Sequence, residues 1–161
     1  MYLQRFTLEY RIADKSYYER ATEKFSDMDE TRISGKHILL AEDNDLNAEI
    51  TMTVLEENGL KAERVADGRK CVEAVRKMLA DYFDMILMDI QMPGLDGYEA
   101  TKQIRHLGDS RAQIPIIAMT ANAFDEDRKK SLDVEMNDHI AKPVDQETLF
   151  EIMARTIKQT L

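Results

Sequence analysis

The sequence has a single cysteine, no surplus of positive charge and no long apolar run. Cys71 has no partner for an internal disulfide, which is typical of a reducing compartment, so we expect the protein to be cytoplasmic. A formal net charge of −9 disfavours nucleic acid and anionic membranes as partners, because both attract basic patches. No apolar stretch approaches the roughly 20 residues of a membrane span, and residues 1–5 do not resemble a signal peptide.

From residue 33 onward, apolar stretches alternate regularly with amphipathic ones. The apolar stretches predict five β-strands, at residues 37–41, 61–66, 84–89, 114–119 and 138–141. Between them apolar residues recur at helical spacing, as Leu46, Ile50 and Val54 do. This alternation predicts an α/β fold in which helices cover both faces of a parallel sheet. With 161 residues, 43% of them hydrophobic, the chain can bury one sizeable core.

Local signals predict where helices begin and which residues they bury. We expect Asp45 to cap the helix after the first strand, and Asp67-Gly68 to open the next helix. The inner face of that second helix is predicted to carry Cys71, Val75, Met78 and Leu79. Cys71 is therefore interpreted as a small core residue and not as a reactive thiol.

Polar side chains follow four of the predicted strands at the point where each strand ends. Asp89 is the best defined, because the apolar residues Met85–Met88 before it predict a strand buried on both faces. The carboxyl ends of parallel strands share one edge of a sheet, and ligands bind there. We therefore expect one cluster made of Glu42 and Asp43 after the first strand, Asp89 after the third, Thr120 after the fourth and Lys142 after the fifth.

The charges of this cluster indicate its chemistry. Two unit charges 4 Å apart interact by roughly 4 kcal/mol at an effective dielectric constant of 20, so either one carboxylate stays protonated or a cation lies among them. Hard oxygen ligands with room for water favour Mg²⁺. A carboxylate nucleophile at Asp89, beside a divalent cation, Lys142 and the Thr120 hydroxyl, would suit phosphoryl transfer.

Each of these residues also has a simpler interpretation. The acidic run 42–45 and Thr120 could cap the helices that follow them, and Lys142 could be a solvated loop lysine. Their coincidence at one edge of the predicted sheet favours the functional interpretation.

Four stretches of the sequence resemble the motifs of response-regulator receiver domains of two-component signalling. Asp89 and Thr120 are 120 − 89 = 31 residues apart, and Thr120 and Lys142 are 142 − 120 = 22 apart, and both separations fit that family. The resemblance covers residues 36–159 and implies a flavodoxin-like, doubly wound (βα)5 fold with strand order 2-1-3-4-5. The matching stretches are Ile38–Asn44, Met88–Gly97, Ile116–Asn122 and His139–Pro143.

The resemblance also implies how the site works. Asp89 would accept a phosphoryl group from the phosphohistidine of a histidine kinase, and then change conformation or pass the group to a phosphotransfer (HPt) protein. Such a module would catalyse only its own phosphorylation and hydrolysis and would not be a metabolic enzyme. The implied Mg²⁺ ligands are Glu42, Asp43, Asp89 and the backbone carbonyl of Gln91, the implied phosphoryl contacts are Thr120 and Lys142, and the Lys142-Pro143 bond is implied to be cis.

One position departs from the family pattern. His139 stands three residues before Lys142, at a position where the family often has Tyr or Phe. In the family, that aromatic side chain swings inward together with the threonine. His139 is therefore interpreted either as part of the switch with Thr120 or as a partly buried edge histidine.

Residues 1–32 differ from the rest of the chain. Phe6, Leu8, Tyr10 and Ile12 alternate with polar residues, which predicts a half-buried strand, and residues 14–32 are polar enough for a linker. Residues 5–14 resemble the last strand of a histidine kinase ATP-binding domain. We therefore expect a receiver domain at 33–161, taken from the C-terminal part of a hybrid histidine kinase that could be membrane-anchored. Residues 1–32 are expected either to form a homodimer contact or to lie apart from the receiver.

Rival functions are less consistent with the sequence. An aspartate-nucleophile phosphatase of the haloacid dehalogenase type needs a second Asp two residues after the nucleophile, where Gln91 stands. A receiver that acts as a phosphorylation-independent interaction domain usually loses part of the acidic set, which is complete here. A flavin-binding module of the same architecture is disfavoured, because acids after the first strand would repel the flavin phosphate.

Overall fold

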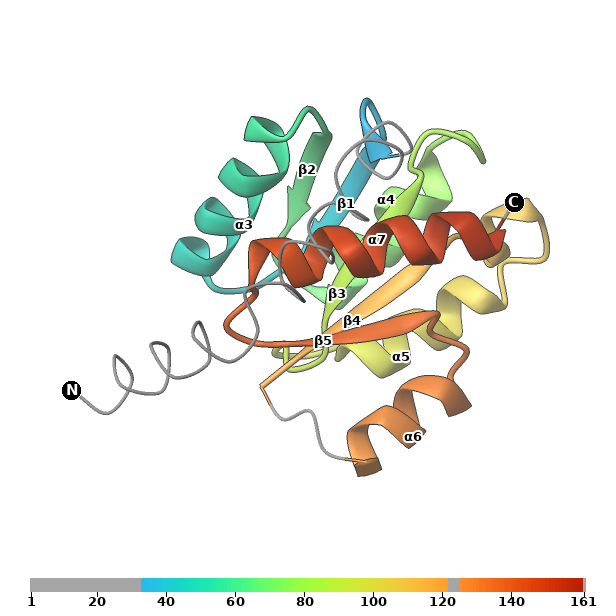
Figure 1. Ribbon diagram of the computed structural model, residues 1–161. Coiled ribbons are helices and arrows are strands. Elements are labelled where there is room, and N and C mark those ends of the chain that lie inside the picture. Colours follow the sequence, from blue (N-terminus) through green and yellow to red (C-terminus); the bar gives the residue numbers. More distant parts are fainter. Residues whose placement is uncertain (1–32, 122–124, 161) are drawn as a thin grey trace. The chain divides into compact units, whose positions relative to one another are not determined.

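The computed structural model describes residues 33–121 and 125–160, so the predictions on residues 1–32 lie outside the described residues. In the described part, strands and helices alternate along the chain as predicted (Figure 1). The elements are β1 His37–Ala41, α3 Asp45–Glu57, β2 Lys61–Val65, α4 Gly68–Lys77, β3 Met85–Asp89, α5 Gly97–Arg105, the 3-10 helix η1 Ser110–Gln113, β4 Ile116–Thr120, α6 Asp125–Asp133, β5 Asp138–Ala141 and α7 Gln146–Thr160.

The five strands form one parallel sheet in the order β2-β1-β3-β4-β5, which confirms the predicted strand order. Every residue of β3 and β4 is buried, whereas the edge strands β2 and β5 are partly exposed. This is the expected burial when helices cover both faces of a parallel sheet. Figure 1 shows α3 and α7 on one side of the sheet and α4 and α5 on the other.

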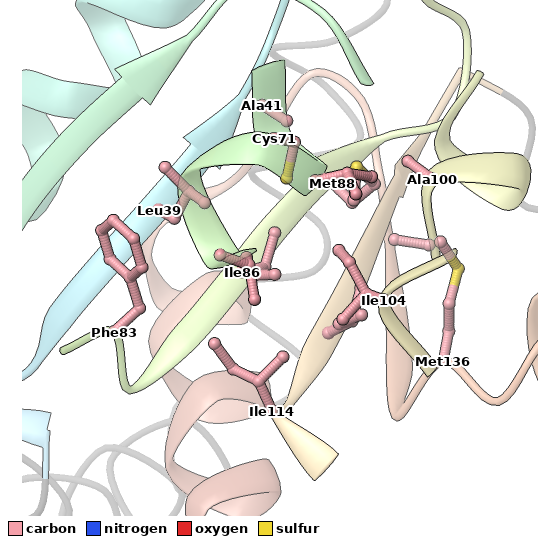
Figure 2. Packing of buried hydrophobic residues seen from close by; sticks show 14 of the residues in the cluster. Leu39, Ala41, Cys71, Phe83, Ile86, Met88, Ala100, Ile104, Ile114 and Met136 are labelled. Carbon is pink, nitrogen blue, oxygen red and sulfur yellow. The ribbon is translucent and has the colours of Figure 1, made fainter. Parts of the chain in front are cut away.

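The core on the side of α4 and α5 is a continuous apolar cluster (Figure 2). Leu39, Ile86 and Met88 point into it from the strands, and Cys71 and Ile104 from the helices. Cys71 is fully buried, and burial together with the nearby Asp67 charge raises the pKa of its thiol to about 12. A thiol with such a high pKa is unreactive at neutral pH, which confirms the interpretation of Cys71 as a core residue.

Helix α3 forms as predicted, but it buries a different face from the one that its largest apolar residues suggest. Leu46 and Ile50 are 64% and 55% exposed, whereas Ala48, Thr51 and Leu55 are buried. The helix carries two interleaved series of residues at helical spacing, and the series Ala48, Thr51 and Leu55 faces the sheet. Spacing alone identifies the helix but cannot decide which of the two series is inside.

Two further local predictions are corrected. Asn44, not Asp45, caps α3, because the Asn44 side chain accepts a hydrogen bond from the Asn47 amide at 2.9 Å. Leu79 is 76% exposed, because α4 ends at Lys77 and the helical spacing no longer applies beyond that point. The predicted start of α4 is confirmed, since the side chain of Asp67 accepts a hydrogen bond from the Lys70 amide at 2.7 Å. Among the described residues, no helix is long and apolar enough to cross a membrane.

The unexpected orientation of α3 gives a matched test within one helix. Leu55→Ala removes a fully buried side chain and should lower the free energy of unfolding by about 2–5 kcal/mol. Leu46→Ala makes the same chemical change at a position that is 64% exposed, and should change it by about 0.5 kcal/mol or less. Urea unfolding of both variants measures the difference, and a larger loss in Leu46→Ala than in Leu55→Ala would show that α3 is turned the other way.

Candidate functional site

The acidic residues predicted at three strand ends meet in one cluster. Glu42, Asp43 and Asp89 each offer a carboxylate oxygen, and these oxygens lie within 4.8 Å of one another. Glu42 and Asp89 are 2% and 3% exposed, whereas Asp43 faces solvent. The cluster therefore has two buried carboxylates at its base and a third at its mouth, an arrangement that could hold a divalent cation.

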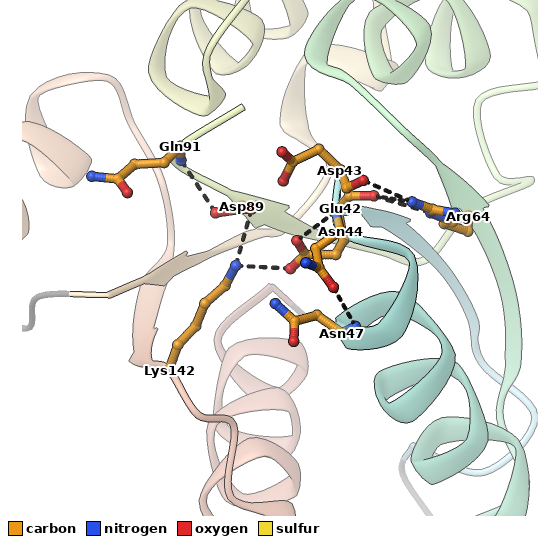
Figure 3. Close-up of polar contacts among 8 residues, drawn as sticks. All are labelled: Glu42, Asp43, Asn44, Asn47, Arg64, Asp89, Gln91 and Lys142. Atoms are coloured by element: carbon orange, nitrogen blue, oxygen red, sulfur yellow. Dashed lines mark hydrogen bonds and ion pairs between the residues drawn. The ribbon is translucent and has the colours of Figure 1, made fainter. Parts of the chain in front are cut away.

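Lys142 reaches into this cluster from the loop after β5. Its Nζ atom lies 2.8 Å from Glu42 Oε2 and 3.0 Å from Asp89 Oδ2 (Figure 3). The Lys142-Pro143 bond is cis, as predicted. Lys142 is therefore not a solvated loop lysine, because its ammonium group bridges two carboxylates from different strands.

Burial and charge both shift the pKa of Asp89. Loss of solvation raises the pKa of this carboxyl to about 6; the Lys142 hydrogen bond opposes the rise and the neighbouring Glu42 charge adds to it. A raised pKa for at least one of the three acids was expected from their crowding, but burial is the larger cause. For Lys142, burial lowers the pKa, but the contacts with Glu42 and Asp89 outweigh this and the net shift is upward. Lys142 is therefore a fixed positive charge.

Backbone contacts hold the two buried acids in place. The Gln91 amide donates to Asp89 Oδ1 at 3.2 Å, and the Asn44 amide donates to Glu42 Oε1 at 3.2 Å. At Gly97, the first residue of α5, a Cβ atom would overlap the carbonyl oxygen of Asp89 and the Cα atom of Ile90. Only glycine therefore lets α5 begin so close to the end of β3.

Thr120 and His139 occupy the neighbouring strands. Thr120 is buried at the carboxyl end of β4 and pairs in register with Ala141, the residue before Lys142. His139 is half-buried on β5, opposite Ala118, and its Nδ1 atom lies 3.8 Å from Asp138 Oδ1. Thr120 is thus placed at the same sheet edge as Lys142. His139 lines a separate surface pocket formed by α6, β5 and α7.

Arg64 contacts the acidic loop from β2, a role that no pattern in the sequence predicted. Its guanidinium group donates to the backbone carbonyl oxygens of Glu42 and Asp43 (Figure 3). It also pairs with the Asp45 carboxylate. Arg64 lies on a short strand of mixed character, where a charged residue is usually solvated. The role of Arg64 follows from the register between the parallel strands β2 and β1, and the sequence does not contain that register.

The fold and the site together define a flavodoxin-like α/β domain with an acidic cleft at the carboxyl edge of its sheet. Residues 38–154 match the family model of the response regulator receiver domain. The chain therefore belongs to the response regulator receiver family of two-component signalling, as the resemblance of its motifs implied.

The curated relatives are much longer histidine kinases. Sensor protein GacS of Pseudomonas syringae is 35% identical over 120 residues, which are 73% of this chain and 13% of GacS. The peroxide stress-activated histidine kinase mak1 of Schizosaccharomyces pombe is 35% identical over 129 residues, which are 79% of this chain and 8% of mak1. The chain thus spans a small part of the length of these relatives.

Solved structures of similar fold include receiver domains from sensor kinases. The receiver domain of a sensor histidine kinase from Pseudomonas aeruginosa, with magnesium coordinated in its active-site cleft, is 41% identical. That match has a TM-score of 0.69 and covers 78% of this chain and 99% of that one. Chemotaxis protein CheY4 of Vibrio cholerae is 26% identical with a TM-score of 0.69, over 76% of this chain and 99% of that one.

The raised pKa of Asp89 predicts how its removal changes the pH dependence of stability. The folded-state value of about 6 exceeds the unfolded value of about 3.9. The folded state is therefore favoured while Asp89 is protonated below about pH 4, and this contribution is lost as the pH rises through 6. Asp89→Asn cannot ionise, so in metal-free buffer it should gain about 2–3 kcal/mol relative to the parent between pH 4 and pH 8.

Urea unfolding across that pH range, in the presence of a chelator, measures the effect. Asp81→Asn is the control, because Asp81 is an exposed acid in the loop before β3. A stability difference between parent and Asp89→Asn that does not change with pH would contradict the assignment.

Proposed function

We propose that this chain is the phosphoacceptor receiver of a phosphorelay, and that Asp89 takes the phosphoryl group from a phosphohistidine. The observation that carries the proposal is the setting of Asp89. It is a buried carboxylate at the end of a central strand, 3.0 Å from Lys142 Nζ, with Glu42 and Asp43 close enough to share a cation. This combination supplies a nucleophile, the positive charge of Lys142 and a site for a divalent cation in one cleft.

The cation in this proposal is Mg²⁺. The donor set fits, because Glu42, Asp43 and Asp89 offer oxygen atoms only and Mg²⁺ prefers oxygen ligands while keeping part of its water. The sensor kinase receiver that holds magnesium in its cleft supports the same choice. We assign Asp43, Asp89 and the backbone carbonyl of Gln91 as direct ligands. We expect Glu42 to act through water, with its two oxygens held by Lys142 and Asn44.

The chain's own residues define the transfer step. A carboxylate oxygen of Asp89 attacks the phosphorus atom, the phosphorus–nitrogen bond breaks, and its electron pair leaves with the imidazole of the donor histidine. Lys142 Nζ and the Thr120 hydroxyl, both at this edge, would contact the phosphoryl oxygens, and Ala121 is small enough to leave the pocket open. Bound Mg²⁺ would neutralise charge on the same oxygens.

Gln91 favours this transfer over hydrolysis of a phosphorylated substrate by a phosphatase mechanism. It stands two residues after the nucleophile, where its amide side chain cannot act as a general acid. The phosphoryl group would therefore stay on Asp89 until a phosphotransfer protein or water removes it. Thr120 and His139 are proposed to report its presence to the surface.

The relatives support a parent protein of the hybrid histidine kinase type. GacS and mak1, named as a sensor protein and a histidine kinase, are matched over a small part of their length. We place the receiver at residues 33–161 of this chain, working in the cytoplasm with a histidine kinase and a phosphotransfer protein as partners. The role of residues 1–32, including self-association, stays a prediction.

Intact mass spectrometry after incubation with a small phosphodonor tests the proposal. The parent should gain one phosphoryl group that is stable in acid and labile in base, and only when Mg²⁺ is present. Asp89→Asn should gain none, because an amide is not a nucleophile of this kind, whereas the control Asp81→Asn should behave like the parent. Equal labelling of Asp89→Asn and the parent would sink the proposal.

The metal assignment makes a separate prediction about affinity. Asp43→Asn removes a direct ligand, whereas Glu42→Gln alters a group that acts through water, so Asp43→Asn should weaken Mg²⁺ binding more. Loss of a group behind the direct ligands typically costs about tenfold or more in affinity, and the loss at Asp43 should exceed that at Glu42. Isothermal titration calorimetry measures both dissociation constants. If both variants bind Mg²⁺ like the parent, the ion lies elsewhere.

A further inference from the structure

Arg64 makes four contacts with the loop that carries Glu42 and Asp43. Its Nε and Nη2 atoms donate to the Glu42 carbonyl oxygen at 3.0 and 2.9 Å, and Nη2 also donates to the Asp43 carbonyl oxygen at 3.2 Å. Its Nη1 atom pairs with Asp45 Oδ1 at 2.7 Å. The guanidinium group therefore holds the backbone of Glu42 and Asp43 (Figure 3). It also holds the side chain of Asp45 at the start of α3.

The parallel pairing of β1 and β2 places Arg64 beside this loop. Leu40 pairs with Arg64, Ala41 pairs with Val65, and the Glu42 amide donates to the Val65 carbonyl at 3.1 Å. The loop thus leaves the sheet directly beside the Arg64 side chain, which is 26% exposed. Arginine suits this position because its donors form a rigid, planar fork that can hold several acceptors at once.

Asp43 depends on this backbone support more than Glu42 does. The Glu42 carboxylate is buried and held by Lys142 and Asn44. Asp43 is exposed, and among residues 33–121 and 125–160 its carboxylate makes no hydrogen bond or ion pair. The direction in which the Asp43 side chain leaves the loop is therefore set by the backbone that Arg64 fixes.

We propose that Arg64 is a positioning residue that holds the β1–α3 loop in the conformation that binds the metal ion. This inference rests on the proposed function, in which Asp43 is a direct Mg²⁺ ligand. Arg64 would act through the loop backbone and would not touch the ion.

Charge and positioning make opposite predictions for Mg²⁺ affinity. The positive charge of Arg64 repels a nearby cation, so on charge alone its removal should strengthen binding. Loss of the backbone contacts should weaken binding, because the ligands must then be ordered when the ion binds. The direction of the change therefore separates the two effects.

Two substitutions and one control exploit this difference. Arg64→Lys keeps the charge but loses the planar fork, and Arg64→Gln loses both. Lys61→Gln, at the exposed opposite end of β2, removes the same charge without touching the loop. If Arg64 positions the loop, Arg64→Lys should raise the Mg²⁺ dissociation constant about tenfold. Arg64→Gln should raise it somewhat less, because charge removal offsets part of the loss, and Lys61→Gln should leave it unchanged.

The other possible results overturn the inference. An unchanged constant in Arg64→Lys with tighter binding in Arg64→Gln would show that Arg64 acts through its charge alone. A second readout needs no metal: amide hydrogen exchange at Asp43 and Asn44 in metal-free protein should be faster in Arg64→Lys and unchanged in Lys61→Gln. Urea unfolding of each variant establishes that the affinity is measured on folded protein.

Failure of the inference can be told apart from failure of the proposed function. Asp43→Asn is titrated with Mg²⁺ in parallel with the parent. If the parent binds no Mg²⁺, or Asp43→Asn binds it equally well, the metal assignment itself is wrong. If Asp43→Asn loses affinity while Arg64→Lys binds like the parent, the metal site stands and the role of Arg64 is wrong. A further check is the Mg²⁺ dependence of phosphorylation, because Arg64→Lys should need more Mg²⁺ for half-maximal rate but reach the parent's rate at saturation.

Discussion

The contact of Lys142 with two buried carboxylates is the interaction on which the site depends. Glu42 and Asp89 come from different strands, and each would be costly to ionise alone in the interior. One lysine offsets only part of the negative charge that two buried acids carry, and the pKa of Asp89 stays raised, at about 6. The cluster thus retains unbalanced negative charge on buried side chains. A divalent cation is the ligand that best relieves such an imbalance, which connects the electrostatics of the cleft with the proposed phosphoryl transfer.

The acidic residues of the site come from central strands of the sheet, and its two basic residues come from the edge strands. β1 and β3 are adjacent central strands, and the acids follow them directly. Arg64 lies on the edge strand β2, and Lys142 follows the opposite edge strand β5. Lys142 reaches the acidic side chains, whereas Arg64 reaches the backbone beneath them. The two basic residues therefore have different roles. Lys142 balances charge in the cleft, and Arg64 would fix the loop that presents the acids.

The same arrangement leaves one acid of the cluster, Asp43, exposed to solvent. Two acids are held in place by burial and by hydrogen bonds to Lys142, Asn44 and Gln91. Asp43 remains open to solvent, so the proposed ion and phosphoryl donor would reach the cleft from that side. Gly97 has no side chain, and this lets α5 begin directly against the end of β3. Two fixed acids and one exposed acid would suit the proposed transfer, in which the chain accepts a phosphoryl group from one protein and releases it to another.

The sequence alone determined the class of fold and the membership of the acidic cluster. Short apolar runs such as Met85–Met88, alternating with helical stretches, are typical of a covered parallel sheet, and parallel strands bring their carboxyl ends to one edge. Glu42, Asp43, Asp89 and Lys142 could therefore be placed together before any distance was known. How deeply these residues are buried, and how far the pKa of Asp89 is raised, could not be predicted.

Only the tertiary structure decided which face of α3 is buried, which residue caps it and what Arg64 does. Both series of α3 recur at helical spacing, so packing against the sheet selected Ala48 and Leu55 over Leu46. Arg64 shows no pattern in the sequence because its role comes from the register between β2 and β1. Periodicity records which elements form, since it depends on neighbours along the chain. Contacts between elements depend on register and packing, which no local pattern contains.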